Sequence, residues 1–516
     1  MRKPMVPGGE AVVVISGVLA AVRSAAVLGI DAHDICVEVD VAPGLPHWTI
    51  VGLPAGEVKE SRERVVAALA NSGFDLPPRR ITVSLSPGDS RKVGTGFDLP
   101  IAIGLLIAMG QLDPASVSDR VFLGELGLDG AIRSVRGVLS VARHIAGPDA
   151  PAFVLPPANV NEASLVRSLR LSAPPTLRDL VDALGSDSLP PARAETIAPV
   201  LDDEADFADV VGQESAKRAL EIAAAGAHAC LLIGPPGAGK TMLARRLPSI
   251  LPALTEEEAL EVTAIHSVAG LLSTSGVCAT TRPFRAPHHS ISSAGLVGGG
   301  GSPRPGEVSL AHNGVLFLDE LLEFPRAALE SLRQPLEDGR VVIARAALSV
   351  AFPARFSLIA AMNPCACGHS GDPRRVCLCS EVEIIRYRGK LSGPLSDRID
   401  MHVTLTPVPI DSLSMVKHGE SSAVIRARVE RAREVQRRRY ASSSVARANG
   451  GAPRRLLWRD VDTGARSLLS AAAESLALSA RGFDRVLRVA RTIADLADSE
   501  RITEAHVAEA IRYRPR

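Results

Sequence analysis

Residues 231–241 read Leu-Leu-Ile-Gly-Pro-Pro-Gly-Ala-Gly-Lys-Thr, and this stretch decides the fold. The apolar residues predict a buried strand, the glycines a tight loop, and the residues from Lys240 onward the start of a helix. Such a loop points backbone amides at phosphate oxygens, and the helix adds the positive end of its dipole. The spacing Gly-x4-Gly-Lys-Thr is that of a P-loop, so the sequence predicts a nucleoside triphosphate site.

A second motif places two carboxylates at the end of another apolar run, Val315–Leu318. Parallel sheets bind ligands at the carboxyl ends of their strands, which is where Asp319 and Glu320 would lie. Asp319 would hold Mg²⁺ together with the Thr241 hydroxyl, and Glu320 would polarise the attacking water. We therefore predict ATP and Mg²⁺ as cofactors, and the predicted cofactor-binding residues are Gly234, Pro235, Pro236, Gly237, Ala238, Gly239, Lys240, Thr241 and Asp319.

Composition narrows the compartment and the class of protein. The chain has 516 residues and a net charge of +1, so any basic surface for DNA must be local. Its seven cysteines, an odd number, argue against a disulfide framework and indicate the reducing cytoplasm. Residues 11–30 are largely apolar, but Gly17, Arg23 and Gly29 interrupt them. We expect no membrane association, and a poorly ordered extension over residues 1–20.

Residues 21–185 alternate short strands with helices, which predicts an α+β domain. Two segments of it, Pro87–Gly96 and Leu123–Arg143, resemble those that carry the serine and lysine of Lon-type proteases. The resemblance implies their fold, which is like domain 2 of ribosomal protein S5. It also implies that the chemistry is absent, because Gly96 stands at the serine position and Val141 at the lysine position. We expect a Lon-protease-like domain that lacks the Ser/Lys dyad and forms no acyl-enzyme.

Residues 186–206 hold three prolines, mixed charges and few large apolar residues, which predicts a linker. The next stretch, Phe207–Gln213, resembles the segment before the first helix of AAA+ ATPases, whose backbone contacts adenine. The expected fold class is therefore α/β, with an AAA+ P-loop core over residues 207–400 and a helical lid over residues 401–516.

Four further segments resemble the ComM/YifB family of magnesium-chelatase-like AAA+ proteins; they are Phe284–Gly339, Phe352–Phe356, Ala361–Cys365 and Ser392–Asp400. The similarity covers nearly the whole chain after residue 20. It implies a ring-forming ATPase, expected to be a homo-hexamer, that drives branch migration of DNA during natural transformation. The magnesium-chelatase motor subunit, which remodels a partner protein, shares the ATPase core but lacks the Lon-like domain. A scaffold that uses ATP only to assemble is a third class.

The same resemblance assigns two more site residues. Asn363 closes an apolar strand and would be sensor 1, which hydrogen-bonds the attacking water or the γ-phosphate. Arg398 resembles the arginine finger that reaches the nucleotide of a neighbouring subunit. The alternative for Arg398 is an internal salt bridge to Asp397 or Asp400.

The lid is expected to supply sensor 2, which is an arginine, and a basic helix. A helix expected to begin near Arg481 would supply sensor 2 from Arg481, with Arg485 as the alternative one turn later. Val424–Arg439 is predicted to be a helix with seven arginines. This helix could touch DNA or pack on the next subunit.

Four cysteines form two C-x-C pairs; they are Cys365, Cys367, Cys377 and Cys379. Four thiolates could hold a tetrahedral structural Zn²⁺, although C-x₂-C is the usual spacing. A reduced loop or a redox-sensitive dithiol are the alternatives. His288 and His289 are a weaker metal candidate, because neighbouring side chains diverge on a strand. We expect their loop to become ordered at a subunit contact.

A hairpin is predicted between the region that follows Glu320 and the strand that leads to Asn363, the predicted sensor 1. Glu337–Arg340 is followed by Val341–Phe352, in which two β-rich runs flank a tip of small residues. This resembles the pre-sensor 1 hairpin of related AAA+ proteins, which projects into the pore of the ring. Arg345, near the tip, would touch a DNA phosphate; the alternative is a solvated turn residue.

Overall fold

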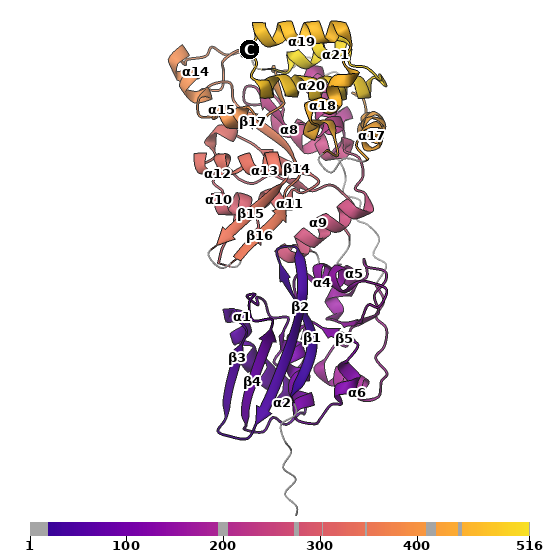
Figure 1. Ribbon diagram of the computed structural model, residues 1–516. Helices are drawn as coiled ribbons and strands as arrows, with labels where there is room; N and C mark the ends of the chain where they lie inside the picture. Colours follow the sequence, from indigo (N-terminus) through magenta and orange to yellow (C-terminus); the bar gives the residue numbers. More distant parts are fainter. Residues whose placement is uncertain are drawn as a thin grey trace, which may run out of the picture. The chain divides into compact units, whose positions relative to one another are not determined.

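The computed structural model describes residues 19–194, 205–272, 278–301, 303–345, 348–408, 419–441 and 446–514 (Figure 1). The chain divides into two compact units. Unit 1 comprises Met1–Ile197 and Ser267–Cys278, and unit 2 comprises Ala198–His266 and Ala279–Arg516. Most of the expected extension 1–20, and residues 195–204 of the expected linker, lie outside the described residues. Among the helices that are described, none has both the length and the apolar character needed to cross a bilayer.

Unit 1 contains a seven-stranded mixed sheet in the order β3-β4-β2-β1-β5-β8-β9. β1 and β2 form an antiparallel hairpin around Gly29, whose φ of 69° suits glycine. β4 pairs with β2 in antiparallel fashion, and the remaining strands are added in parallel. The strands are β1 (Ala20–Leu28), β2 (Asp31–Ala42), β3 (His47–Val51), β4 (Arg80–Ser86), β5 (Arg120–Phe122), β8 (Ala152–Val154) and β9 (Leu171–Ser172), with a separate pair β6 (Glu125–Leu126) and β7 (Ile132–Arg133).

The first strand begins earlier than the sequence predicts. We expected a strand at Val27–Ile30, but β1 starts at Ala20 and Ile30 lies in the turn. Alanine and serine fill many positions of β1, so its apolar alternation is weak in the sequence. The helices of unit 1 are α1 (Gly56–Lys59), α2 (Ser61–Asn71), α3 (Asp98–Ala108), α4 (Val138–Ile145), α5 (Val160–Ala163) and α6 (Leu177–Gly185).

The two positions that replace the protease dyad are packed. A Cβ at Gly96 would lie 2.8 Å from Cδ1 of Leu123, which leaves no room for a serine side chain without movement. Val141 is fully buried in the core between α4 and the sheet. Neither position therefore presents a side chain to solvent.

Unit 2 contains a five-stranded sheet in the order β11-β14-β17-β10-β18, in which every pairing is parallel. β10 lies between β17 and β18, so the chain crosses over beside the strand that leads into the P-loop. Ligands of open α/β sheets bind at such a crossover, outside the carboxyl ends of the strands. The strands are β10 (Cys230–Ile233), β11 (Phe284–Arg285), β14 (Val315–Leu318), β17 (Ser357–Met362) and β18 (Met401–Thr404), with a small pair β12 (Gly298–Gly299) and β13 (Arg304–Pro305).

The C-terminal helices share one hydrophobic core with this sheet, so they belong to the same unit. Leu232 of β10 and Leu487 of α20 are members of one buried cluster. The sheet continues through β18, past residue 400, where we placed the start of the lid. The helices of unit 2 are α7 (Glu214–Gly226), α8 (Lys240–Arg246), α9 (Glu256–Ala269), α10 (Ser293–Val297), α11 (Glu307–Leu310), α12 (Arg326–Ser331), α13 (Arg333–Asp338), α14 (Glu381–Arg388), α15 (Gly393–Ser396), α17 (Ser422–Arg439), α18 (Arg454–Leu457), α19 (Thr463–Ser475), α20 (Ala480–Leu496) and α21 (Glu504–Arg512).

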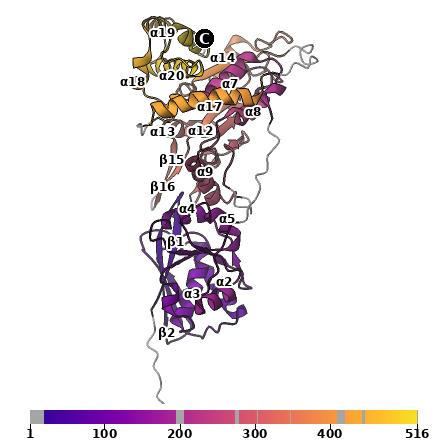
Figure 2. The same ribbon diagram turned by 90° about the vertical axis from the view of Figure 1, so that its right-hand side faces the viewer.

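The arginine-rich helix α17 packs along α7 and α20 (Figure 2). Most of its arginines form ion pairs or hydrogen bonds with other residues of unit 2. Arg428 pairs with Glu221 at 2.5 Å, and Arg439 pairs with Asp495 at 2.6 Å. Burial lowers the pKa of Arg433 to about 10, and its guanidinium donates to a carbonyl of α7 at 3.0 Å. These contacts lie within one chain, so neither of the two alternatives, DNA contact or packing on the next subunit, follows from them.

The expected hairpin is present as β15 (Arg340–Arg345) and β16 (Leu348–Pro353), which pair antiparallel along their length. Residues 346–347 at its tip lie outside the described residues. β16 runs into β17 through three residues, so the hairpin is joined directly to the strand that precedes Asn363.

Candidate functional site

The P-loop between β10 and α8 has the geometry that its glycines predict. Gly237 and Gly239 have φ values of 77° and 87°, a region that disfavours residues with a Cβ. A Cβ at Gly234 would lie 2.9 Å from the carbonyl oxygen of Leu405, so this position also requires glycine. The loop is therefore held close to the sheet, with its backbone free to face a phosphate.

Lys240 joins the P-loop to the predicted sensor 1. Its Nζ donates to the carbonyl oxygens of Gly234 at 2.7 Å and Pro235 at 3.1 Å. It also donates to Oδ1 of Asn363 at 3.1 Å, across the pairing of β10 with β17. Burial lowers the pKa of Lys240, and the carboxylates at the end of β14 oppose that shift. Two residues far apart in sequence thus meet where a terminal phosphate would bind.

Thr241 and Asp319 also meet. The Thr241 hydroxyl donates to Oδ2 of Asp319 at 2.6 Å, and the backbone N–H of Glu320 donates to Oδ1 at 3.0 Å. A hydroxyl and a carboxylate are oxygen ligands of the kind that Mg²⁺ prefers. The two side chains fit the predicted magnesium site.

Glu320 has a partner that the sequence did not reveal. Its backbone lies in the left-handed region with φ of 52°, a conformation that costs about 1–3 kcal/mol and often marks a functional residue. Nδ1 of His289 lies 3.4 Å from Oε2 of Glu320, and the His289 ring meets the Phe324 ring edge-on. The signal that could have shown this is the parallel pairing of β11 with β14. This pairing places the residues that follow β11 at the edge of the sheet where Glu320 lies.

Gln213, at the start of α7, contacts the P-loop from the other side. Its side-chain amide donates to the carbonyl oxygens of Ala238 at 3.1 Å and Thr406 at 2.6 Å. The segment expected to contact adenine is thus beside the phosphate-binding loop.

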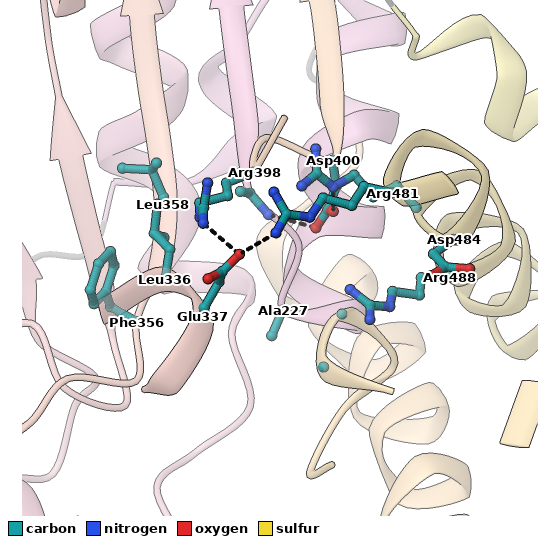
Figure 3. Close-up of a pocket in the computed structure, with 14 residues that line it drawn as sticks. Ala227, Leu336, Glu337, Phe356, Leu358, Arg398, Asp400, Arg481, Asp484 and Arg488 are labelled. Carbon is teal, nitrogen blue, oxygen red and sulfur yellow. Dashed lines mark hydrogen bonds and ion pairs between the residues drawn. The ribbon is translucent and has the colours of Figure 1, made fainter. Parts of the chain in front are cut away.

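A second site in unit 2 is a pocket of about 300 Å³ rich in arginine (Figure 3). Its described lining contains no residue of the P-loop. We call it the arginine pocket; it is lined by Ala227, Ala229, Leu336, Glu337, Phe356, Leu358, Arg398, Asp400, Gly450, Gly451, Arg481, Asp484, Arg485 and Arg488. The predicted finger and both candidates for sensor 2 therefore lie together, away from the P-loop of their own chain.

Glu337 is the carboxylate shared by Arg398 and Arg481. Its Oε1 lies 2.5 Å from Nη2 of Arg398 and 3.4 Å from Nη2 of Arg481. The hydrogen bond from Arg398 lowers the pKa of Glu337. The ion-pair partner of Arg398 is thus neither Asp397 nor Asp400, the two that we had weighed.

The two candidates for sensor 2 differ in accessibility. Arg481 is 58% exposed, whereas Arg485 is 8% exposed and lies 3.4 Å from Asp400. Asp400 also pairs with the buried His228 at 3.2 Å. Arg485 is therefore part of an internal network, whereas Arg481 is largely exposed and pairs only with Glu337 among the described residues.

The four cysteines of the cluster meet just beyond Asn363. Their sulfur atoms all lie within 4.8 Å of one another, and three Sγ–Sγ distances are 3.4, 3.6 and 3.7 Å. A tetrahedral Zn²⁺ with bonds of about 2.3 Å would set them about 3.8 Å apart. A Cβ at Gly368, next to Cys367, would lie 2.9 Å from Cδ of Pro236. The cluster could hold Zn²⁺, and its loop packs against the P-loop.

Comparison with known proteins agrees with this geometry. Residues 206–413 match the family model described as magnesium chelatase, subunit ChlI, residues 37–159 match subunit ChlI of Mg-chelatase, and residues 419–514 match its C-terminal model. The chain is 44% identical over 504 residues to competence protein ComM of Haemophilus influenzae, covering 96% of this chain and 97% of that protein. It is 42% identical over 500 residues to YifB of Escherichia coli, covering 96% and 97%.

A partial likeness extends to a protease. The chain is 30% identical over 143 residues to Lon protease 2 of Bacillus subtilis, covering 27% of this chain and 26% of that protein. The full-length matches decide the assignment, because they span both units at well over 30% identity. The chain belongs to the ComM and YifB family of magnesium-chelatase-like proteins.

Proposed function

We propose that the chain hydrolyses ATP at the P-loop site and uses the energy to move DNA strands. One observation supports ATP hydrolysis: five functional residues lie together at one edge of the unit 2 sheet. They are Lys240, Thr241, Asp319, Glu320 and Asn363. Together they supply phosphate binding, magnesium ligands, a base and a γ-phosphate sensor.

Each residue then has one role. Lys240 binds the β- and γ-phosphates, and Thr241 and Asp319 hold Mg²⁺, which neutralises phosphate charge when bound. Glu320 accepts a proton from the attacking water, and His289 fixes the direction of its carboxylate. Asn363 orients the water or the γ-phosphate.

The arginines require a second copy of the chain. Arg398 and Arg481 line a pocket that contains no described P-loop residue, so we propose that they complete the site of a neighbouring copy in a ring, taken to be a hexamer. Helix α14 supports self-association, because none of its eight residues is buried. Val382 and Ile385 lie one turn apart on it and are 75% and 71% exposed, as at surfaces that a partner covers.

DNA is the proposed substrate, and branch migration the proposed activity. One relative of nearly full coverage is named a competence protein. The hairpin β15–β16 provides an element that could grip a strand, because it is joined to the sensor strand β17 and carries Arg345.

A competing function is remodelling of a partner protein, which the matches to magnesium-chelatase models favour. ATPase rates with no DNA, single strands, duplex and a four-way junction separate the two. Stimulation by the junction supports the DNA motor. A rate that no DNA changes, but that a protein partner raises, supports the chelatase-type function instead.

We also propose that the cysteine cluster holds one structural Zn²⁺. The sulfur distances fit four thiolate ligands. The backbone N–H of Ser370 donates to Cys365 Sγ at 3.3 Å, and hydrogen bonds of this kind to a ligand atom are typical of metal sites. Thiolate ligation requires a reducing compartment, and we propose the cytoplasm.

A further inference from the structure

We propose that Glu337 is a positioning residue that couples the nucleotide of a neighbouring copy to the hairpin β15–β16. The inference rests on the proposed function, because it requires Arg398 and Arg481 to face a phosphate bound by a second copy. It goes beyond that function in naming the residue that carries the signal from the arginine pocket toward the hairpin.

Glu337 is the group that a phosphate would displace. Arg398 and Arg481 approach its carboxylate from two different parts of the chain, the segment that follows α15 and the start of α20 (Figure 3). Nε of Arg398 is buried and has no hydrogen-bond partner within the described residues. A γ-phosphate offers more acceptor oxygens and more charge than one carboxylate, so it competes for both guanidinium groups.

The other carboxylates of the pocket are already engaged. Asp400 pairs with Arg485 at 3.4 Å and Asp484 pairs with Arg454. Displacement by an anion therefore acts first on Glu337, the side chain between the two arginines that the proposal assigns to the phosphate.

Glu337 lies at the base of the hairpin. It belongs to the last turn of α13, and Gly339 follows in the left-handed conformation with φ of 64°. The backbone N–H of Gly339 caps α13, and its carbonyl oxygen accepts from Ala354 N–H at 2.8 Å, just beyond β16. β15 begins at the next residue, Arg340. A shift of the end of α13 therefore moves both strands at their base.

The hairpin is also connected, through its second strand, to the chain's own nucleotide site. β16 continues into β17, and the residue after β17 is Asn363, which contacts Lys240. The hairpin thus lies between two nucleotide sensors, Asn363 for its own site and Glu337 for that of the neighbour. This arrangement would let hydrolysis pass around a ring in step with hairpin movement.

The test separates the effect of nucleotide bound by a neighbouring copy from the effect of nucleotide bound by the subunit itself. Subunits carrying Lys240→Ala, which cannot bind their own nucleotide, are isotopically labelled and mixed with unlabelled native subunits. Amide hydrogen exchange of β15 and β16 is measured in the labelled subunits with and without a non-hydrolysable ATP analogue. We expect a change of at least about threefold in exchange rate, lost when the labelled subunit also carries Glu337→Gln.

Glu330→Gln is the matched control, because Glu330 also pairs with an arginine, Arg333 at 3.0 Å, but does not line the pocket. Native exchange of β17 in each variant shows that it is folded. A hairpin response that persists with Glu337→Gln overturns the inference. Absence of any response with native Glu337, in mixtures that light scattering shows to be assembled, also overturns it while leaving the ring intact. If no assembly forms, the proposed function itself fails.

Discussion

Glu320 stands at the end of β14, next to Asp319, the predicted magnesium ligand, and beside His289. Replacing Glu320 with Gln keeps the size and the Mg²⁺ ligands but removes the base. We expect ATP binding to survive and the hydrolysis rate to fall by about 10²–10⁴-fold. Asp338→Asn, a change of charge in the same unit, is the control. Near-normal turnover in Glu320→Gln would reject the assignment of the base.

His289 is predicted to orient that base without touching the nucleotide. The change His289→Gln should lower kcat by roughly tenfold and leave KM for ATP within a factor of about two. His288→Gln is the matched control, because His288 bonds to Ser290 and makes no ion pair with Glu320. A rise in KM with unchanged kcat would show that His289 acts in binding and not on Glu320.

At the scale of elements, the cysteine loop is predicted to carry one Zn²⁺ per chain. Cys377→Ser should lose the metal, whereas Cys36→Ser, outside the cluster, should keep it. Because Gly368 packs on Pro236, loss of the metal should also weaken ATP binding several-fold. Metal analysis of protein purified without chelator is the measurement. Substoichiometric zinc, with rapid alkylation of all four thiols in the native protein, would contradict the site.

The hairpin β15–β16 is predicted to grip DNA through Arg345. Arg345→Ala should leave ATP hydrolysis without DNA intact, weaken DNA binding for all sequences, and lower the salt slope by about one unit. Arg340→Ala, at the base of the same hairpin, should change DNA binding less. Titrations of labelled DNA at several salt concentrations measure both the affinity and the salt slope. If DNA affinity and branch migration are unchanged, the grip lies elsewhere, and the exposed arginines of α17 are the next to examine.

Elements with a local pattern were predictable, and those that depend on distant pairing were not. The P-loop and the carboxylates after β14 follow from short motifs, each of which is contiguous in the sequence. His289 lies in a loop, as predicted, but its contact with Glu320 was missed because that contact depends on the pairing of β11 with β14. The start of β1 was missed because alanines carry its buried face.

At the scale of the whole molecule, the sequence did not show where one unit ends. Ser267–Cys278 groups with unit 1 although it lies within the motor sequence, and no change of composition marks it. The partner of Arg398 was missed for a similar reason. Glu337 lies on α13, three strands earlier in the chain than Arg398, and only the folded unit brings the two together.

In the proposed ring, the P-loop of one copy and the arginine pocket of its neighbour are the two halves of one ATPase site. The claim that neighbouring copies share the site is tested most directly by mixing two inactive variants, Lys240→Ala and Arg398→Ala. Alone, the first should fail to bind ATP, and the second should bind it but hydrolyse about 10³-fold more slowly. Mixed in equal amounts, they should recover ATP hydrolysis, because an Arg398→Ala subunit binds ATP and a Lys240→Ala neighbour supplies the arginine. If the mixture assembles into rings but shows no more activity than the sum of its parts, Arg398 does not complete a neighbour's site.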